Sequence, residues 1–178
     1  RKQLKNPNGL ILGTPGCFTG DTRIQLADGT DISFDEMIRQ GIDETEVLAY
    51  DEKNDWFVQA HARDIRIEKY VTKLCVLELD DGSVVRCTDN HLIMTEDGQY
   101  RAASEIQVGT VLSGALLVMN AYTNHLDEPE PVYDMIVDRY SNFILSNGLI
   151  VHNSGKSFSA KREIINVFLS TDDDIILC

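Results

Sequence analysis

Residues 74–102, LCVLELDDGSVVRCTDNHLIMTEDGQYRA, decide the fold class. Apolar-rich runs at 74–79 and 83–87 flank Asp80-Asp81-Gly82, and further runs at 91–95 and 99–102 flank Glu96-Asp97-Gly98. Asp-Gly pairs supply the positive φ angles that tight turns between antiparallel strands need. Each unit therefore predicts a β-hairpin.

The same pattern continues on both sides of this stretch. Runs at 23–26 and 30–33 flank Ala27-Asp28-Gly29, and runs at 143–145 and 149–152 flank Ser146-Asn147-Gly148. Only residues 34–39 and 103–106 have helical spacing, and both segments are short. The sequence predicts an all-β domain at residues 17–153.

The outer segments have a different pattern. Residues 9–13 are an apolar run typical of a buried strand, residues 158–169 have apolar positions at helical spacing, and residues 175–178 are apolar again. Strand, loop, helix and strand is the order of a P-loop βαβ unit. We expect three parts: host fragments at 1–16 and 154–178, cut from a longer protein, and a separate domain at 17–153.

The two host fragments carry the halves of one nucleotide-binding loop. Gly13-Thr14-Pro15-Gly16 ends the first and Ser154-Gly155-Lys156-Ser157 begins the second, and joined they read GTPGSGKS, which fits G-x-x-x-x-G-K-[ST]. In the joined chain we expect ATP and Mg²⁺ to bind there, with the loop amides around the phosphates and the Lys and Ser side chains at the β/γ-phosphates and the metal. The nucleotide-binding residues would be Gly13, Gly16, Ser154, Gly155, Lys156 and Ser157.

Composition excludes several other classes. The 178 residues carry a formal net charge of −13, which opposes nucleic-acid binding. No apolar run is long enough to predict a membrane span, and no signal peptide is visible. Four cysteines have neither metal-ligand spacing nor the density of a disulfide framework. We expect a monomer in a reducing cytoplasm, without a metal and without contact to nucleic acid or membrane.

Four motifs, in order, resemble those of inteins, the self-splicing domains of the hedgehog–intein (Hint) fold. They are Cys17-Phe18-Thr19-Gly20-Asp21-Thr22, Thr88-Asp89-Asn90-His91, residues 132–137 with 142–145, and His152-Asn153 followed by Ser154. The resemblance covers residues 17–153 and implies a horseshoe of short strands. No homing-endonuclease segment is present, so the resemblance is to a bacterial mini-intein, and residues 120–131 are expected to form the exposed loop where such insertions sit. It also implies a reaction in cis, on the chain itself, without a cofactor.

The resemblance assigns the first scissile junction to Gly16 and Cys17. The Cys17 thiol would attack the Gly16 carbonyl and convert the amide into a thioester, since a thiolate is the best side-chain nucleophile near neutral pH. His91 would protonate the departing amide nitrogen, and Thr88 would polarise the Gly16 carbonyl or hold His91.

The second junction is assigned to Asn153 and Ser154. The Ser154 hydroxyl would take over the acyl group, with Asp134 coordinating this step, and the Asn153 side-chain amide would then form a succinimide. His152 would donate a proton to the leaving amine or polarise the Asn153 carbonyl. The family usually carries a histidine where this chain has Ser141, so we expect slowed cyclisation, or another group in that role.

Other residues and readings remain open at this stage. His61 and His125 are expected at the surface and Cys75 and Cys87 in the core, while a disulfide from Cys17 to one of these cysteines or to Cys178 is an alternative. The flanks resemble a conjugative-transfer (type IV secretion) ATPase. Two rival functions are a P-loop ATPase with a permanent β insertion and a Hint domain that cleaves without ligating.

Overall fold

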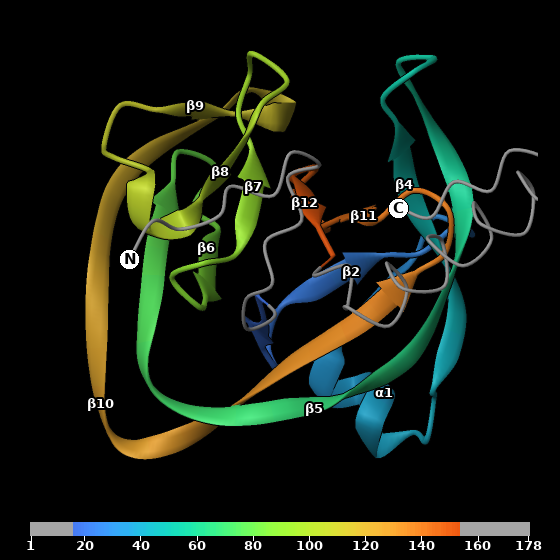
Figure 1. Cartoon of the computed structure of the whole chain (residues 1–178), viewed down its shortest axis with the longest axis horizontal. Coiled ribbons are helices and arrows are strands. Elements are labelled where there is room, and N and C mark those ends of the chain that lie inside the picture. Colours follow the sequence, from blue (N-terminus) through green and yellow to red (C-terminus); the bar gives the residue numbers. More distant parts are fainter. Residues whose placement is uncertain (1–15, 154–178) are drawn as a thin grey trace, which may run out of the picture.

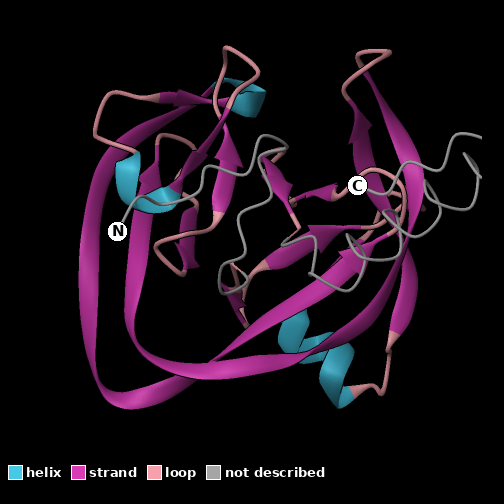
Figure 2. Ribbon diagram, viewed as in Figure 1, coloured by secondary structure: helices cyan, strands magenta, loops and turns pink. Residues whose placement is uncertain are grey.

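The architecture follows from two unusually long strands. The computed structural model describes residues 16–153, which are mainly β-strand. Strands β5 (Trp56–Leu79) and β10 (Leu116–Val137) pair antiparallel along most of their length and curve together into the horseshoe that surrounds the shorter strands (Figure 1). The all-β prediction is confirmed, and Figure 2 shows how little of this part is helical.

The remaining strands are short. They are β1 (Phe18–Thr19), β2 (Arg23–Gln25), β3 (Asp31–Ser33), β4 (Glu44–Asp51), β6 (Val84–Cys87), β7 (Leu92–Met94), β8 (Tyr100–Ala102), β9 (Val111–Leu112), β11 (Asn142–Ile144) and β12 (Ile150–His152). The four expected hairpin turns are present, and the last residue of each turn is a glycine with φ between 77° and 91°. The Asp-Gly and Asn-Gly pairs therefore do act as turns.

The predicted helix at 34–39 is α1 (Phe34–Arg39), the one α-helix within residues 16–153. Ser33 caps it: its Oγ accepts a hydrogen bond from the Glu36 amide at 3.2 Å, and the Glu36 carboxylate accepts one from the Ser33 amide at 2.9 Å. The second helical segment is a 3₁₀ turn, η1 (Ala103–Glu105), and a further one, η2 (Ser113–Ala115), precedes β10.

The prediction of an exposed loop at 120–131 is wrong. Residues 120–125 and 130–131 lie within β10 and pair with β5. The loop was predicted from the Asp, Glu and Pro residues of this segment. Such residues can also stand in a strand that has one face exposed to solvent. An irregularity does exist: His125 pairs with Lys73 and Glu130 with Val71, so residues 126–129 stand opposite residue 72 alone. Residues 127–129 in this bulge are exposed.

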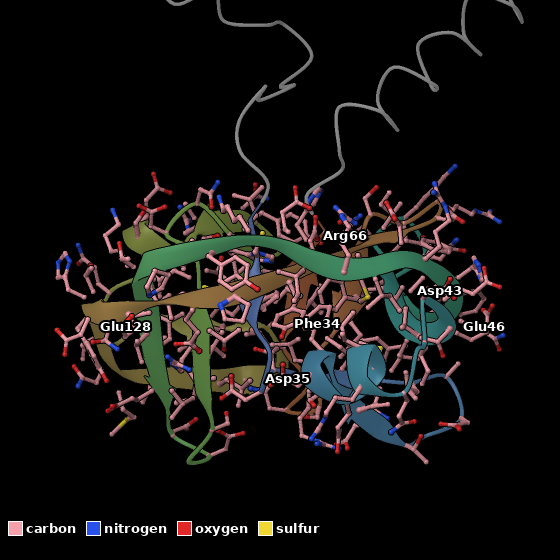
Figure 3. The ribbon with its side chains drawn as sticks, turned by 90° about the horizontal axis from the view of Figure 1, so that it is seen from below. Phe34, Asp35, Asp43, Glu46, Arg66 and Glu128 are labelled. Carbon is pink, nitrogen blue, oxygen red and sulfur yellow. The ribbon has the colours of Figure 1, made fainter. Side chains whose placement is uncertain are left out.

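The core fills the horseshoe where α1, β1, β10 and β11 meet. Phe34 stacks on Tyr133 with ring centroids 5.7 Å apart, and Phe143 meets Phe18 and Phe34 edge-on at 6.0 and 6.5 Å. The Tyr133 hydroxyl donates to Asp35 at 2.6 Å; Figure 3 shows Asp35 beside Phe34 at the start of α1. Burying each such aromatic side chain stabilises the fold by about 1.5–3 kcal/mol.

The topology brings the two ends of the described chain to one place. Strand β1 at the N-terminal end pairs with β6 and β10. Strand β12 at the C-terminal end pairs with β7, which begins directly after His91. Both ends therefore lie against the segment 88–91 that joins β6 to β7. The predicted βαβ unit and its nucleotide-binding loop lie mostly outside the described residues, as do Gly13, Ser154, Gly155, Lys156, Ser157 and Cys178.

Candidate active site

Thr88 holds the backbone of Cys17 from both sides. The Cys17 amide donates to Thr88 Oγ1 at 2.9 Å, and the Thr88 amide donates to the Cys17 carbonyl, also at 2.9 Å. Cys17 is fully buried and packs with Leu74 and Val132. These two hydrogen bonds hold the nitrogen of the Gly16–Cys17 peptide bond and the carbonyl of the next peptide.

His91 lies directly against Gly16. A Cβ placed on Gly16 would lie 2.7 Å from His91 Cα and 2.7 Å from its Nδ1, so only glycine fits without displacement. The imidazole is 2% exposed and packs on the Phe18 ring with centroids 4.0 Å apart. The sequence prediction that His91 and the first junction share a site agrees with this geometry.

His91 is uncharged at neutral pH. Burial and the nearby His152 lower its pKa to about 3, against an opposing effect of the Gly16 and His152 backbones. Among the described residues neither ring nitrogen has a hydrogen bond of standard geometry. A ring with so low a pKa is a weak base, so it can take up a proton only as it passes the proton on within one step.

Asp134 acts on Cys17 through its charge. Burial has the largest effect on the Cys17 thiol and the negative charge of Asp134 the second largest, and together they raise its pKa to about 12. The positive charges of Lys69 and Arg66 act in the opposite direction. Asp134 is 2% exposed and stands opposite Arg66 in the β10–β5 register, with Arg66 Nη2 3.6 Å from its Oδ2. Figure 3 shows Arg66 on the β5 ribbon. The thiol is therefore protonated in the resting chain.

Asn153 is held at the second junction by Ser141 and Val137. Its backbone amide donates to the Ser141 carbonyl at 3.0 Å. With the side-chain amide turned to satisfy both ends, its nitrogen donates to the same carbonyl at 2.8 Å and its oxygen accepts from the Val137 amide at 3.2 Å. Ser141 has φ 56°, in the left-handed region, and so presents its carbonyl to Asn153.

His152 faces a residue that the sequence motifs did not include. The Tyr100 ring meets the His152 ring edge-on, at 5.2 Å between centroids and an angle of 85°. Burial lowers the pKa of His152, while the Asn153 backbone and Glu52 raise it. Since His152 also affects the pKa of His91, the two histidines lie within electrostatic reach of each other.

The structure thus brings most of the predicted site residues together. Gly16 contacts His91, Thr88 is hydrogen-bonded to the Cys17 backbone, and His152 lies within electrostatic reach of His91. Ser154 lies outside the described residues. Sequence reasoning missed Arg66 and Tyr100, because a contact between strands leaves no spacing signal along the chain.

The remaining candidate residues lie elsewhere. His61 and His125 are at the surface, and His61 pairs with Glu46 at 2.7 Å and Glu44 at 3.4 Å. Cys75 and Cys87 are buried partners in the β5–β6 register and form no disulfide within residues 16–153. The same residues contain no cluster of three metal-ligating side chains. None of their helices has the length and apolar character of a membrane span.

Comparison by sequence gives limited information. No protein-family model matches the chain. A DNA gyrase subunit from Synechocystis sp. is 29% identical over 92 residues, a match that takes in 51% of this chain but 8% of the gyrase protein. The chain therefore spans a small part of that curated relative.

Comparison by structure identifies the fold. A DnaB intein from Synechocystis sp. PCC 6803 matches with a TM-score of 0.64 and 22% identity, over 78% of this chain and 99% of that chain. A bacterial intein-like domain from Clostridium thermocellum matches at 0.67 and 22%, over 79% and 100%. The TvoVMA intein matches at 0.67 and 20%, over 78% and 98%. The described part of the chain has the Hint fold seen in inteins.

Proposed function

We propose that residues 17–153 are a mini-intein that excises itself and ligates Gly16 to Ser154. One observation carries the proposal: buried His91 contacts Gly16, at the first junction, and lies within electrostatic reach of His152, at the second. A permanent insertion has no need for a buried histidine close to both of its ends. Structural likeness to inteins supports the same reading.

The first step forms a thioester. The Cys17 sulfur attacks the Gly16 carbonyl carbon, the carbon–nitrogen bond breaks, and His91 passes the thiol proton to the Cys17 nitrogen. The thiol needs this help because its pKa lies at about 12. Thr88 holds the Cys17 backbone in place during this step.

The later steps move the host onto Ser154 and release the domain. The Ser154 hydroxyl attacks the thioester, and its proton goes to the departing Cys17 sulfur. The charge of Asp134 favours the protonated form of that sulfur. Asn153 Nδ2 then attacks its own carbonyl carbon, and the bond to the Ser154 nitrogen breaks as that nitrogen takes a proton from His152. The proton that Nδ2 loses returns to the His152 ring. The ester on Ser154 rearranges to an amide. Each step uses residues of the chain itself, in cis and without a cofactor.

The host consequences belong to the same proposal. Splicing would rebuild the loop GTPGSGKS, so that the host binds ATP and Mg²⁺ only after excision. From the residues that follow Ser157, we assign the host to the conjugative-transfer ATPases of the bacterial cytoplasm. The splicing domain acts as a monomer. The match takes in 8% of the gyrase protein, as expected if a related domain is inserted in that protein.

Intact-mass spectrometry of the purified chain over time tests the proposal. Splicing gives two species, residues 17–153 and residues 1–16 joined to 154–178. Separate flanking peptides would instead establish a Hint domain that cleaves without ligating. A mass that stays unchanged, with no Gly16 hydroxamate formed in hydroxylamine, would contradict the proposal and favour a permanent insertion.

A further inference from the structure

Tyr100 lies beside the second junction, and the proposed steps leave it without a role. It begins β8, pairs with Met94 of β7, and β7 in turn pairs with β12 through Ile93 and Val151. The Tyr100 side chain reaches across this sheet to the His152 ring, 5.2 Å away between centroids. Two strand pairings, β8 with β7 and β7 with β12, therefore fix where Tyr100 stands relative to His152.

The hydroxyl of Tyr100 is tied to a carboxylate. It donates to Glu52 Oε1 at 3.1 Å, in the turn between β4 and β5. That turn is anchored close by, because the Asn142 side chain accepts from the Tyr50 amide at 2.7 Å and donates to the Tyr50 carbonyl at 2.8 Å. The hairpin that carries Glu52 is thus fastened to β11, the neighbour of β12.

The groups that act on His152 can be named. They are the Tyr100 ring, the Glu52 carboxylate, the His91 imidazole and the Asn153 backbone. Glu52 is the one carboxylate among them, and its charge favours a protonated His152 against the effect of burial. A protonated His152 is the form that can deliver a proton to the leaving amine of Ser154.

We propose that Tyr100 and Glu52 are positioning residues for Asn153 cyclisation, acting through His152. The inference rests on the proposed splicing function. Tyr100 fixes the plane of the imidazole, and Glu52 supports its positive charge. The bond changes are those already given: Asn153 Nδ2 bonds to the Asn153 carbonyl carbon, the bond to the Ser154 nitrogen breaks, and the His152 proton moves to that nitrogen. The proton released from Nδ2 returns to His152. Residue 141 contributes a carbonyl that holds Asn153, and the proton is delivered by His152, which Tyr100 and Glu52 position.

The experiment isolates the second junction. In the full chain carrying Cys17→Ala, no thioester can form, and release of residues 154–178 reports Asn153 cyclisation alone. Its rate is followed by intact mass across the pH range for Tyr100→Phe, Tyr100→Leu and Glu52→Gln. Tyr122→Phe and Glu78→Gln are matched controls. The Tyr122 hydroxyl of β10 donates to Glu78 of β5 at 3.3 Å, so this is a second Tyr–Glu hydrogen bond, one that does not involve His152.

Two results are expected. Glu52→Gln moves the pH midpoint of cleavage to lower pH and slows cleavage at neutral pH, by about threefold, because fewer His152 rings are protonated. Tyr100→Leu slows cleavage about tenfold, with Tyr100→Phe between it and the reference. In a His152→Ala background none of these changes has any further effect, and the control pair changes nothing.

Other results would overturn the inference. An unchanged pH midpoint in Glu52→Gln would contradict it. Equal slowing by the Tyr100 variants in chains with His152 and in chains with His152→Ala would also contradict it, because it would show that Tyr100 has a purely structural role. Tyr100→Phe keeps the ring and guards against loss of folding in Tyr100→Leu. If the Cys17→Ala reference itself forms no succinimide and the unaltered chain forms no ligated product, the proposed function fails and this inference with it.

Discussion

Gly16 has no room for a side chain. The position that its Cβ would take lies 2.7 Å from both the backbone and the ring of His91. The contact makes the residue before Cys17 part of the site.

Gly16→Ala should therefore slow the first junction selectively. The added methyl group must displace His91 from the Gly16 carbonyl, and we expect thioester formation to fall at least about tenfold. Thiol-induced cleavage at Gly16 and release of residues 154–178 should be measured on the same protein. Equal slowing of both junctions would contradict this prediction.

The charge states of Cys17 and His91 predict an unusual pH dependence. With pKa values of about 12 and about 3, the thiol and the neutral ring are the resting forms throughout the neutral range. Thioester formation in an Asn153→Ala chain should then be nearly constant from about pH 6 to about pH 9. Cleavage at saturating thiol checks this, since attack by a free Cys17 thiolate would instead rise about tenfold per pH unit.

His91 also predicts how the fold responds to acid. Its folded pKa lies below its unfolded value, so the unfolded chain binds the extra proton, and stability is lost as pH falls from about 6.5 towards 3. In a chain kept intact by Cys17→Ala and Asn153→Ala, His91→Leu should remove up to about 5 kcal/mol of this acid sensitivity. Urea unfolding at several pH values measures it.

His61 is the matched control for the acid experiment. Hydrogen bonding to Glu46 raises the pKa of His61, so its small contribution is present at low pH and is lost as pH rises through the folded value. His61→Gln should leave the acid sensitivity in place. A flattened profile in His61→Gln, or an unchanged one in His91→Leu, would show that another group titrates.

At the scale of elements, the β5–β10 ribbon carries the charges that act on Cys17. Arg66 of β5 contacts both Asp134 across the ribbon, at 3.6 Å, and Glu68 on its own strand, at 2.6 Å. A carboxylate as buried as Asp134 requires a cationic or hydrogen-bonding neighbour. The register of two strands thus decides the environment of Cys17, which directly precedes a third strand, β1.

Arg66→Met should destabilise the fold by about 2 kcal/mol and slow thioester formation, because it removes a cation that favours the Cys17 thiolate. Arg63→Met is the control: Arg63 pairs with Asp138 at 2.9 Å, with side chains 33% and 45% exposed, and should cost less than about 1 kcal/mol. Urea unfolding and thiol-induced cleavage measure the two effects. Equal losses in both variants would contradict a special role for Arg66.

The elements also separate what the sequence could predict from what it could not. Hairpin turns are local, so the Asp-Gly and Asn-Gly pairs located them correctly, and the Ser33–Glu36 capping box agrees with a helix at 34–39. The 24 residues of β5 and 22 of β10 were not predicted, because each is held by a partner far along the chain. Cys17, Thr88 and His91 could be named from motifs, whereas Tyr100 reaches the site only through strand pairing.

At the scale of the whole molecule, the bulge at residues 126–129 is the place where the horseshoe tolerates change. Its residues have no paired partners in β5, and 127–129 are exposed. A Gly-Ser-Gly-Ser insertion between Asp127 and Glu128 should cost less than about 1 kcal/mol and leave splicing unchanged. The same insertion between Tyr122 and Thr123, which pair with Val76 and Cys75, should abolish folding. Thermal unfolding and intact mass compare the two chains.

Both ends of the described part of the chain, residues 16 and 153, lie near His91, and this has a consequence for any protein that carries the domain. A folded insert whose ends leave from one point adds little more closure entropy to its carrier than a short surface turn, however many residues it contains. The carrier's own strands and helices can then assemble around it while it is still in place. A site as tightly built as a phosphate-binding loop can be interrupted in this way without preventing the rest of the carrier from folding.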